Sequence, residues 1–306
     1  MNLFKKFKTF DEILPSFLAD IKMQIGAKSY LSYTGKCKVF SDWLYVHELK
    51  ETPLNKLTSQ DISEFFTYLA GHRNLDKPTC QKYAITIKKV FQYAQKRDEV
   101  EVIPFDLVSY PKKKADMSSE VINPDHIKVL LGAIKKKDPQ LYLACLTQYY
   151  TFIRPGTELR LLKVRDINLE VGTIQVVTDH AKNGHKRIVT MPTQLIELCK
   201  EQGIDKAGKD LFVFGKHKRP DSQPCSVNML TYRFNKYRDK FGMPKGYKLY
   251  SWKHTGATTL HNSNTVSLHE LMQQLGHSKL SSTEHYIKKQ AGIVNTRIRD
   301  HFPSPI

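Results

Sequence analysis

Hydrophobic residues recur at helical spacing through the first hundred positions of the chain. Starting at Phe10, this spacing predicts a series of helices, with later ones at 30–49, from Asp61 and at 79–95. The polar residues directly ahead of Asp61, beginning at Thr58, are typical of a helix start. The pattern therefore predicts an N-terminal domain built from four helices.

Prolines and a basic run interrupt this pattern after position 102. Pro104 and Pro111 cannot continue a regular helix, and three lysines follow the second proline. We predict an interdomain linker over residues 103–120. It separates a helical domain at 1–102 from a second domain at 121–306.

The second domain opens with a helix start, because Asn123 is a good cap and Pro124 suits the first helical position. The spacing predicts helices through Lys137 and at 141–152. Further helices are expected at 194–202, 227–241, 253–262, 268–275 and 281–290.

Residues 160–191 change to an alternating, β-branched pattern. Gly172 and the Asn183-Gly184 pair supply turns between three short runs, which predicts a small antiparallel sheet. The fold class expected from the whole pattern is mainly α with a small antiparallel β-sheet (α+β).

The net charge of the chain indicates what kind of partner it binds. The chain has 48 Lys and Arg against 30 Asp and Glu, so its formal net charge of +18 favours a polyanion such as nucleic acid. The alternative is a basic surface that serves solubility alone. The expected DNA-facing residues lie on the polar side of the helix at 79–95 and in the linker: Lys82, Lys88, Lys89, Lys112, Lys113 and Lys114.

Composition also narrows the setting of the protein. No apolar run is long enough for a membrane span, and the basic start is not followed by an apolar signal core. We therefore expect a cytoplasmic protein that associates with the nucleoid when bound to DNA. Five widely spaced cysteines without a Cys-x-x-Cys pair favour neither a disulfide scaffold nor a thiolate zinc site.

Arg154 stands where an apolar helix ends and the chain turns at Pro155-Gly156 into a further predicted helix. An arginine at such a junction can present its planar fork to phosphate oxygens. Glu158 lies four residues later and is placed to orient that fork. The alternative is a purely structural ion pair between the two.

Two lysines are candidates for phosphate chemistry. Lys182 lies at the tip of the predicted hairpin, where an amine can donate a proton to a leaving oxygen, although basic residues are common at hairpin tips. Lys253 falls in the first turn of a helix, where its positive charge is repelled by the helix dipole. Its presence there is understandable if the site binds an anion such as phosphate. Its alternative is an exposed surface residue, and His254 beside it is expected to be structural.

His277 and Tyr286 lie nine positions apart, across a Gly-His-Ser turn and the start of a predicted helix. A phenol is a poor nucleophile at neutral pH, so its use on phosphate requires neighbours that stabilise negative charge. The alternatives are a half-buried amphipathic tyrosine and a histidine that caps a helix.

These segments together resemble the tyrosine recombinase family of lambda-integrase-like enzymes, over most of the chain. Residues 154–159 match the Arg-x-x-x-Glu-Leu segment, and Leu275-Gly276-His277-Ser278 with Thr283-x-x-Tyr286 is the most specific match. The middle box departs from the usual His-x-x-Arg-His pattern. Here the corresponding residues are Tyr250, Lys253 and His254.

The resemblance implies roles for these positions. Arg154, Lys182, Lys253, His277 and Tyr286 correspond to the catalytic residues, with Glu158, Tyr250 and His254 supporting them. It implies a SAM-like core-binding domain at 1–102, a catalytic domain at 121–306, and cleavage of double-stranded DNA through a 3′-phosphotyrosine. The expected assembly is a homo-tetramer on two DNA sites, without metal, ATP or another cofactor.

Two other functions stay open from the sequence. One is a catalytically impaired DNA-binding protein of the same fold, which the same helices and charge would serve. The other is a metal-dependent nuclease that uses Asp179, His180 and His185, although their spacing is not a recognised metal pattern.

Overall fold

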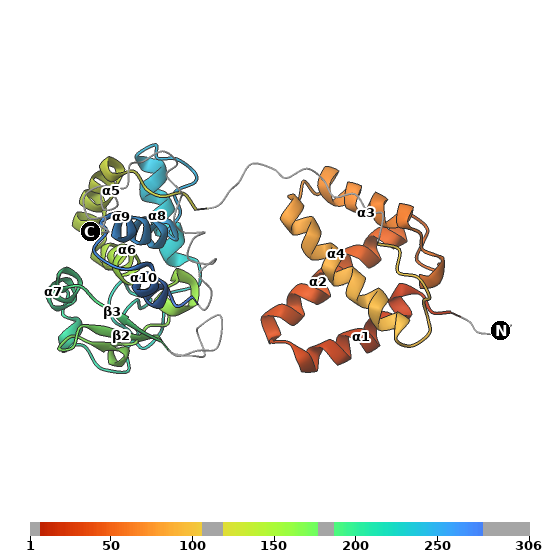
Figure 1. Cartoon of the computed structure of the whole chain (residues 1–306), viewed down its shortest axis with the longest axis horizontal. Helices are drawn as coiled ribbons and strands as arrows, with labels where there is room; N and C mark the ends of the chain where they lie inside the picture. Colours follow the sequence, from red (N-terminus) through yellow and green to blue (C-terminus); the bar gives the residue numbers. More distant parts are fainter. Residues whose placement is uncertain (1–6, 106–118, 177–186, 278–306) are drawn as a thin grey trace, which may run out of the picture. The chain divides into compact units, whose positions relative to one another are not determined.

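A computed structural model of the chain describes residues 7–105, 119–176 and 187–277. The chain divides into two compact units, Met1–Asp116 and Met117–Ile306 (Figure 1). The three lysines of the predicted linker, Lys112, Lys113 and Lys114, lie outside the described residues. None of the helices within the described ranges combines the length and apolarity that crossing a membrane requires.

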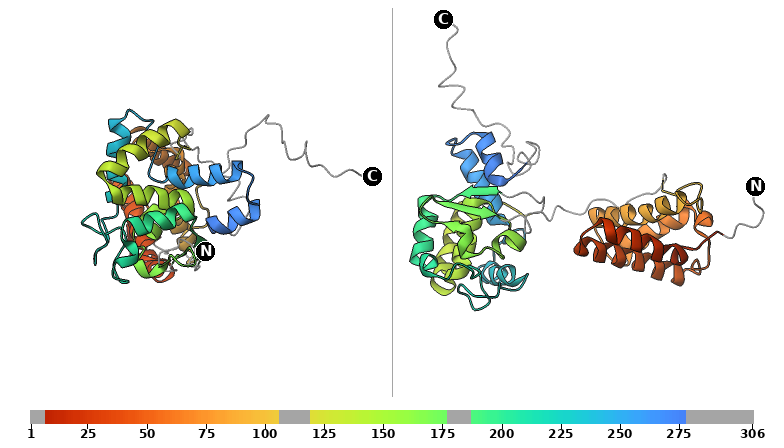
Figure 2. Two further views of the ribbon diagram at one scale, coloured as in Figure 1. Left: turned by 90° about the vertical axis from the view of Figure 1, so that its left-hand side faces the viewer. Right: turned by 90° about the horizontal axis from the view of Figure 1, so that it is seen from below.

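Helices account for the described part of the first unit, and α4 packs against each of the others (Figure 2). Its elements are α1 (Phe10–Gln24), α2 (Ala27–Val46), the 3-10 turn η1 (Leu54–Lys56), α3 (Ser59–Gly71) and α4 (Lys77–Gln95).

Capping residues set where these helices begin. Thr58 and Asp61 form a capping box, so α3 starts at Ser59, two residues before the predicted start. In the same way, the Asp76 side chain accepts a hydrogen bond from the Thr79 backbone, and α4 starts at Lys77. The four predicted helices are confirmed, with ends that differ by a few residues.

Aromatic side chains fill the core of the first unit. Phe40 lies at its centre and meets Phe10 and Phe65 edge-on, with ring centroids 4.8 Å apart in both pairs. All three rings are fully buried. Such pairs favour the edge-to-face arrangement and bury large apolar areas.

Helix α6 is the centre of the second unit and contacts α5, α7, α8 and α9 (Figure 1). The helices of the unit are α5 (Pro124–Lys137), α6 (Pro139–Thr151), α7 (Thr193–Glu201), α8 (Met229–Lys240), α9 (Ser251–Asn262) and α10 (Leu268–Leu275), with short turns at η2 (Pro155–Leu159), η3 (Val164–Asp166) and η5 (Ile204–Lys206).

The approach of α9 to α6 depends on a glycine. A Cβ atom at Gly256 would lie 1.8 Å from the carbonyl oxygen of Tyr149 in α6, so a side chain cannot fit there. This close contact brings the first turn of α9, which carries Lys253, next to the end of α6, which leads to Arg154.

A small antiparallel sheet lies beside these helices, as the alternating pattern predicts. Its strands, in the order β1-β2-β3, are β1 (Ile167–Asn168), β2 (Thr173–Val176) and β3 (Arg187–Thr190). Ile174 pairs with Val189 and both are buried, whereas Ile188 is exposed. The predicted turn at Asn183-Gly184 lies outside the described residues.

Cysteines lie in the cores of both units. Cys145 and Cys199 belong to the core of the second unit, and Cys37 and Cys80 to that of the first. All five cysteines are buried and carry free thiols.

Asn123 caps α5 by accepting a hydrogen bond from the Asp125 backbone, with Pro124 in the first turn, which confirms the predicted start of the second domain's first helix.

Candidate active site

The backbone turns sharply just before Arg154. Helix α6 ends at Thr151, and the next residue, Phe152, has a left-handed conformation with φ of 56°. A bulky residue rarely adopts this conformation, and here burial of its ring against Ala257 and Leu271 holds it in place. Packing between α6, α9 and α10 thus determines where Arg154 leaves the helix.

Arg154 directly precedes a five-residue π-helical turn, η2, where a regular helix was predicted. The turn is closed by Glu158. The Arg154 backbone N–H donates to Glu158 Oε2 at 2.8 Å, and Arg154 Nη1 donates to Oε1 at 2.6 Å. A carboxylate therefore holds both the backbone and the guanidinium of Arg154, as predicted for Glu158.

Glu158 also holds a second arginine, which the sequence analysis did not select. Arg187, the first residue of β3, donates from Nη1 to Oε1 at 3.1 Å and from Nη2 to Oε2 at 2.7 Å. The Glu158 side chain is fully buried, whereas the side chains of Arg187 and Arg154 are 13% and 21% exposed. One carboxylate is thus shared by two guanidinium groups.

This sharing keeps Glu158 ionised. Burial by itself raises the pKa of a carboxylic acid, but the hydrogen bonds and charges of Arg187 and Arg154 outweigh burial and hold the Glu158 pKa below its ordinary value. The three groups together carry a net charge of +1. The cluster is therefore basic even after its internal ion pairs are counted.

Lys253 adds a buried amine to the cluster. It lies in the first turn of α9, and its side chain is fully buried, so the alternative of an exposed surface lysine is wrong. Burial and then the positive charge of Arg154 lower the pKa of Lys253 to about 7. Glu158 partly opposes them, and Arg187 makes the smallest contribution, also lowering the pKa. A bound phosphate would favour its protonated form.

His277 completes the described part of the cluster. It follows Gly276, which ends α10 in a left-handed conformation with φ of 68°. Burial, together with the charges of Lys253, Arg154 and Arg187, lowers the pKa of His277 to about 4. At neutral pH this histidine is therefore an uncharged hydrogen-bonding group.

The supporting residues Tyr250 and His254 lie at the start of α9. Tyr250 directly precedes the first residue of the helix, and its ring meets the His254 ring edge-on, with centroids 5.0 Å apart. Both therefore lie within one turn of Lys253. Lys182 and Tyr286, the predicted proton donor and nucleophile, lie outside the described residues, so their roles stay predictions.

A pattern in the sequence points to Arg187. Alternation along β3 places Arg187 on the same side of the strand as Val189, which is fully buried. A cation on the buried side of a strand requires a carboxylate partner. That partner, Glu158, is 29 positions away in the sequence.

The α4 lysines predicted to face DNA belong to the first unit. Lys82 and Lys89 are exposed and Lys88 is partly buried. Lys89 Nζ donates to the Tyr33 hydroxyl of α2 at 2.9 Å and lies 5.4 Å from the centroid of that ring. The charge of Lys82 acts on Lys36 of α2 and contributes to its lowered pKa, of which burial is the larger cause. Helices α2 and α4 therefore share a basic surface.

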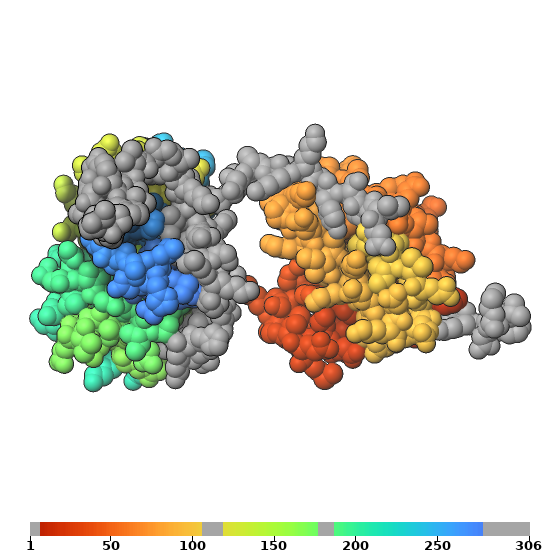
Figure 3. Space-filling view, viewed as in Figure 1, coloured from red at the N-terminus to blue at the C-terminus, as the bar shows by residue number. Residues whose placement is uncertain are grey.

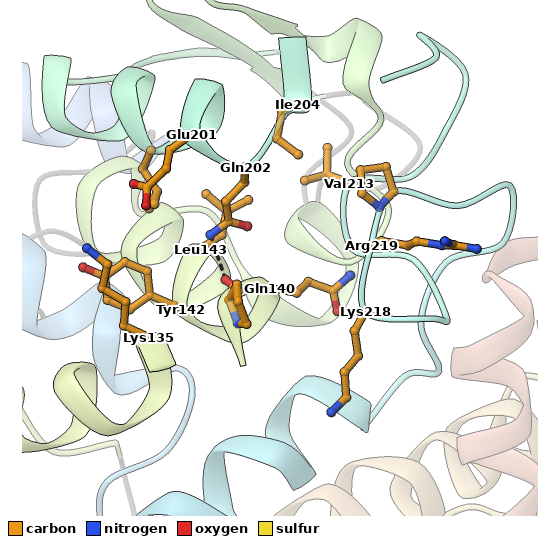
Figure 4. Close-up of a pocket in the computed structure, with 13 residues that line it drawn as sticks. Lys135, Gln140, Tyr142, Leu143, Glu201, Gln202, Ile204, Val213, Lys218 and Arg219 are labelled. Carbon is orange, nitrogen blue, oxygen red and sulfur yellow. Dashed lines mark hydrogen bonds between the residues drawn. The ribbon is translucent and has the colours of Figure 1, made fainter. Parts of the chain in front are cut away.

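Two hollows of the second unit lie apart from the buried charges of the cluster. One, of about 410 Å³, is lined by residues of α5, α6 and α7 and by the segment around Lys218 (Figure 4). The other, of about 690 Å³, is lined by residues of α6, β3, α9 and α10. Helix α10 contacts both α9 and β3 and lies at the surface, drawn in blue in Figure 3. Neither lining includes Arg154, Glu158, Lys253 or His277.

Metal binding was the third possibility raised by the sequence. Within the described ranges, no three His, Cys, Asp or Glu side chains are arranged to hold a metal ion. Asp179, His180 and His185 lie outside those ranges.

Comparison with known proteins assigns the family. The phage integrase family matches residues 120–292, more than half of the chain, and the phage integrase SAM-like domain matches residues 9–114. The chain belongs to the phage integrase family. The expectation of a tyrosine-type site-specific recombinase, drawn from the sequence, is confirmed at the level of the family.

Named relatives agree with this assignment. Tyrosine recombinase XerD of Staphylococcus aureus is 23% identical over 287 residues, which cover 90% of this chain and 93% of the relative. The TnP I resolvase of Bacillus thuringiensis is 22% identical over 260 residues, covering 82% and 86% of the two chains.

Solved structures share the fold. A lambda integrase dimer bound to a COC′ core site has a TM-score of 0.77 at 16% identity, covering 95% of this chain and 80% of its own. The Tn1549 transposon integrase in complex with a circular intermediate DNA has a TM-score of 0.76 at 17% identity, covering 93% and 96%. The mainly helical fold with a small antiparallel sheet is therefore confirmed.

Proposed function

We propose that the protein is a site-specific recombinase or integrase that cleaves and rejoins double-stranded DNA through a 3′-phosphotyrosine at Tyr286. The observation that carries this proposal is the buried basic cluster, in which Arg154 and Lys253 stand beside the neutral His277. Pre-organised cations in a site that excludes water stabilise a negatively charged transition state strongly.

The proposed step is an in-line displacement at phosphorus. The Tyr286 oxygen forms a bond to phosphorus as the bond to the 5′ oxygen breaks, and Lys182 gives that oxygen its proton. The phenol loses one proton and the leaving oxygen gains one, so the step needs no net proton. Arg154 and Lys253 stabilise the charge on the phosphoryl oxygens, with His277 donating a hydrogen bond.

The covalent phosphotyrosine would retain the bond energy of the cleaved phosphodiester. A 5′ hydroxyl from a second duplex attacks the phosphotyrosine and reverses the step, so we propose that no ATP is consumed. Side-chain cations supply the charge stabilisation that a metal ion supplies in other phosphoryl transfer enzymes, so we propose no metal cofactor either.

The first unit would bind the duplex. Residues 1–102 form the proposed core-binding domain, joined by a basic linker at 103–120 to a catalytic domain at 121–306. Lys82 and Lys89, which are exposed on α4, and Lys88 are proposed contacts. The linker lysines Lys112, Lys113 and Lys114 are further proposed contacts. Cations on phosphates supply affinity without reading sequence.

Assembly is proposed to be a homo-tetramer on two DNA sites, because strand exchange between two duplexes breaks four strands. A lambda integrase tetramer bound to a Holliday junction shares the fold, with a TM-score of 0.77. Acting on chromosomal or mobile DNA, the protein would work in the cytoplasm, at the nucleoid.

Replacement of the nucleophile tests the proposal. Tyr286→Phe removes one oxygen atom, so we expect the covalent protein–DNA adduct on a nicked suicide substrate to be lost while duplex binding is retained. The measurement is adduct yield by denaturing gel, with affinity measured by mobility shift, both in EDTA. An adduct formed by Tyr286→Phe at the wild-type yield would contradict the assignment of Tyr286, and inhibition of the wild type by EDTA would contradict metal independence.

A catalytically impaired DNA-binding protein is the second candidate. The observation that favours it is the middle box, where Tyr250 and Lys253 replace the usual histidine and arginine, and lysine lacks the two-pronged geometry of arginine. The same suicide substrate separates the two, because an impaired protein binds the duplex and leaves no adduct.

A further inference from the structure

Arg187 has the geometry of an orienting group. Its two terminal nitrogens approach the two oxygens of Glu158 at 3.1 and 2.7 Å, a bidentate pair. Arg154 reaches the same carboxylate from the other side through its backbone N–H and Nη1. The orientation of the carboxylate, and with it that of Arg154, is therefore determined by both arginines.

Arg187 also contacts the turn that carries His277. A Cβ atom at Gly276 would lie 2.5 Å from Arg187 Cδ, so the glycine allows the arginine side chain to pass under this turn. Residue 276 also requires a left-handed conformation. Three separate segments therefore meet at one side chain: the η2 turn, strand β3, and the end of α10.

We propose that Arg187 is a positioning residue for DNA cleavage, which holds Glu158 so that Arg154 faces the scissile phosphate and which sets the place of His277. This inference rests on the proposed function and assigns a role that the sequence comparison with tyrosine recombinases did not supply. Arg187 acts through Glu158 and Gly276 and does not itself contact the phosphate.

The charge of Arg187 has a second effect. It lowers the pKa of Lys253 and of His277, in addition to burial and the charge of Arg154. Helix α6, which packs closely on α9, carries no charged residue, and the charged residues of α10, His269 and Glu270, are exposed. Among the described residues, the charges of Arg154, Glu158 and Arg187 therefore act on the pKa of Lys253, and Lys253 in turn lowers the pKa of His277.

The sign of this effect is testable. If protonated Lys253 clamps phosphate, cleavage at subsaturating DNA declines as pH rises through the pKa of Lys253 in the free protein. Removing the positive charge of Arg187 raises that pKa. The decline in cleavage then moves to higher pH, while a variant that only loosens the fold slows cleavage equally at every pH.

The experiment compares Arg187→Gln and Arg187→Lys in the full chain, by single-turnover cleavage of a suicide substrate between pH 6 and 9. We expect Arg187→Gln to slow cleavage by about 100-fold, the cost of a misplacement near 1 Å, with DNA affinity changed less than about 3-fold. Arg187→Lys keeps the charge and loses the fork. It is expected to slow cleavage without moving the pH at which it declines.

Glu158→Gln completes a double-mutant cycle. If Arg187 acts through Glu158, the double variant cleaves no more slowly than Glu158→Gln alone, so the two effects are not additive. Arg165→Gln is the matched control, because Arg165 pairs with Asp210 at the surface of the same unit. That variant should cleave at the wild-type rate.

Each outcome bears on the inference. Additive effects, or a slow Arg187→Gln variant with an unmoved pH profile, would overturn it. If Arg187→Gln does not fold, the cycle is carried out with Arg187→Lys, and additivity decides. Failure of the proposed function is a separate result, because it would appear as a wild-type protein that forms no adduct.

Discussion

The candidate DNA-contacting lysines of the first unit and the cationic cluster of the second lie in opposite surroundings. In the first unit, Lys82 and Lys89 lie on the surface of α4, outside a core of aromatic rings. In the second unit, Lys253 is fully buried, and Arg154 and Arg187 are largely covered and share the buried Glu158. Lysine is thus exposed on α4 and enclosed in the cluster of the second unit.

Exposed and enclosed cations are suited to different tasks, the first to binding a polyanion and the second to stabilising charge in a reaction. Exposed cations are screened by salt and keep their protons at every physiological pH, so they supply affinity for a polyanion. Enclosed cations lose hydration, interact strongly with one another, and have shifted pKa values. A site of the second kind is costly to fold and is organised before the substrate arrives.

The largest effect on stability is expected from a substitution at Glu158, the only carboxylate of the enclosed cluster among the described residues. Glu158→Gln leaves two guanidinium groups without a counter-charge, and removing one partner of a buried pair costs about 3–5 kcal/mol of stability. We expect this loss in the free energy of unfolding by urea, together with DNA cleavage that is slower than that of the wild type but still measurable.

The matched control for Glu158→Gln is Asp210→Asn at the surface. Asp210 pairs with Arg165, and both are exposed, so its replacement should cost less than about 1 kcal/mol. Equal losses for the two variants would mean that the buried cluster is no more sensitive than a surface pair.

A smaller effect of opposite sign is expected at Lys253. Its pKa of about 7 in the folded protein lies below the ordinary 10.5, so between these values the unfolded chain binds more protons and stability rises with pH. Lys253→Met removes the titrating amine and with it this loss of stability at low pH. We expect it to raise the free energy of unfolding at pH 6 by about 1–4 kcal/mol and to abolish cleavage.

Unfolding measured from pH 6 to 9 checks this expectation. The wild type should gain stability over that range relative to Lys253→Met, and Lys200→Met, which changes an exposed lysine of α7, should differ from the wild type by less than about 0.5 kcal/mol. Lys253→Arg keeps a charge at every pH, so its cleavage should persist where the wild type declines. A less stable Lys253→Met at pH 6 would show that the amine stabilises the fold.

The smallest effect on stability is expected on α4. Lys82→Gln with Lys89→Gln should leave the free energy of unfolding within about 0.5 kcal/mol. DNA affinity should fall, and the slope of log affinity against log salt should decrease by about 0.9 for each phosphate contact removed. Cleavage at saturating DNA should be unchanged.

Binding measured at several salt concentrations checks this, with Lys50→Gln and Lys56→Gln as a control of equal charge outside α4. A control pair that lowers the slope as much as the α4 pair would mean that net charge, and not the α2 and α4 surface, determines the affinity of the first unit.

Local features of the sequence were sufficient for most of the fold. Helix α10 spans Leu268–Leu275 as predicted, because a capping box at Ser267 and a glycine at 276 mark its two ends within the segment itself. The strand pattern around Val189 likewise predicted a small antiparallel sheet. Errors at helix starts, as at Ser59, came from choosing the wrong polar residue as the cap.

The sequence predicted most of the residues that belong to the candidate site but, apart from the pairing of Glu158 with Arg154, not how they contact one another. Arg154, Glu158, Lys253 and His277 were selected from local motifs and family resemblance, and the structure brings them together. The π-helical form of the turn after Arg154 and the part played by Arg187 were missed, because both depend on contacts between segments far apart in the chain. The roles of Lys182 and Tyr286 stay predictions.

Local patterns specify helices and strands because capping and periodic burial act between residues a few positions apart. Whether a lysine binds solvent or is enclosed depends on which helices pack over it, as Gly256 allows α9 to pack on α6 above Lys253. Burial, shared carboxylates and shifted pKa values are properties of that packing. They appear only when distant segments such as η2, β3 and α9 are brought into contact.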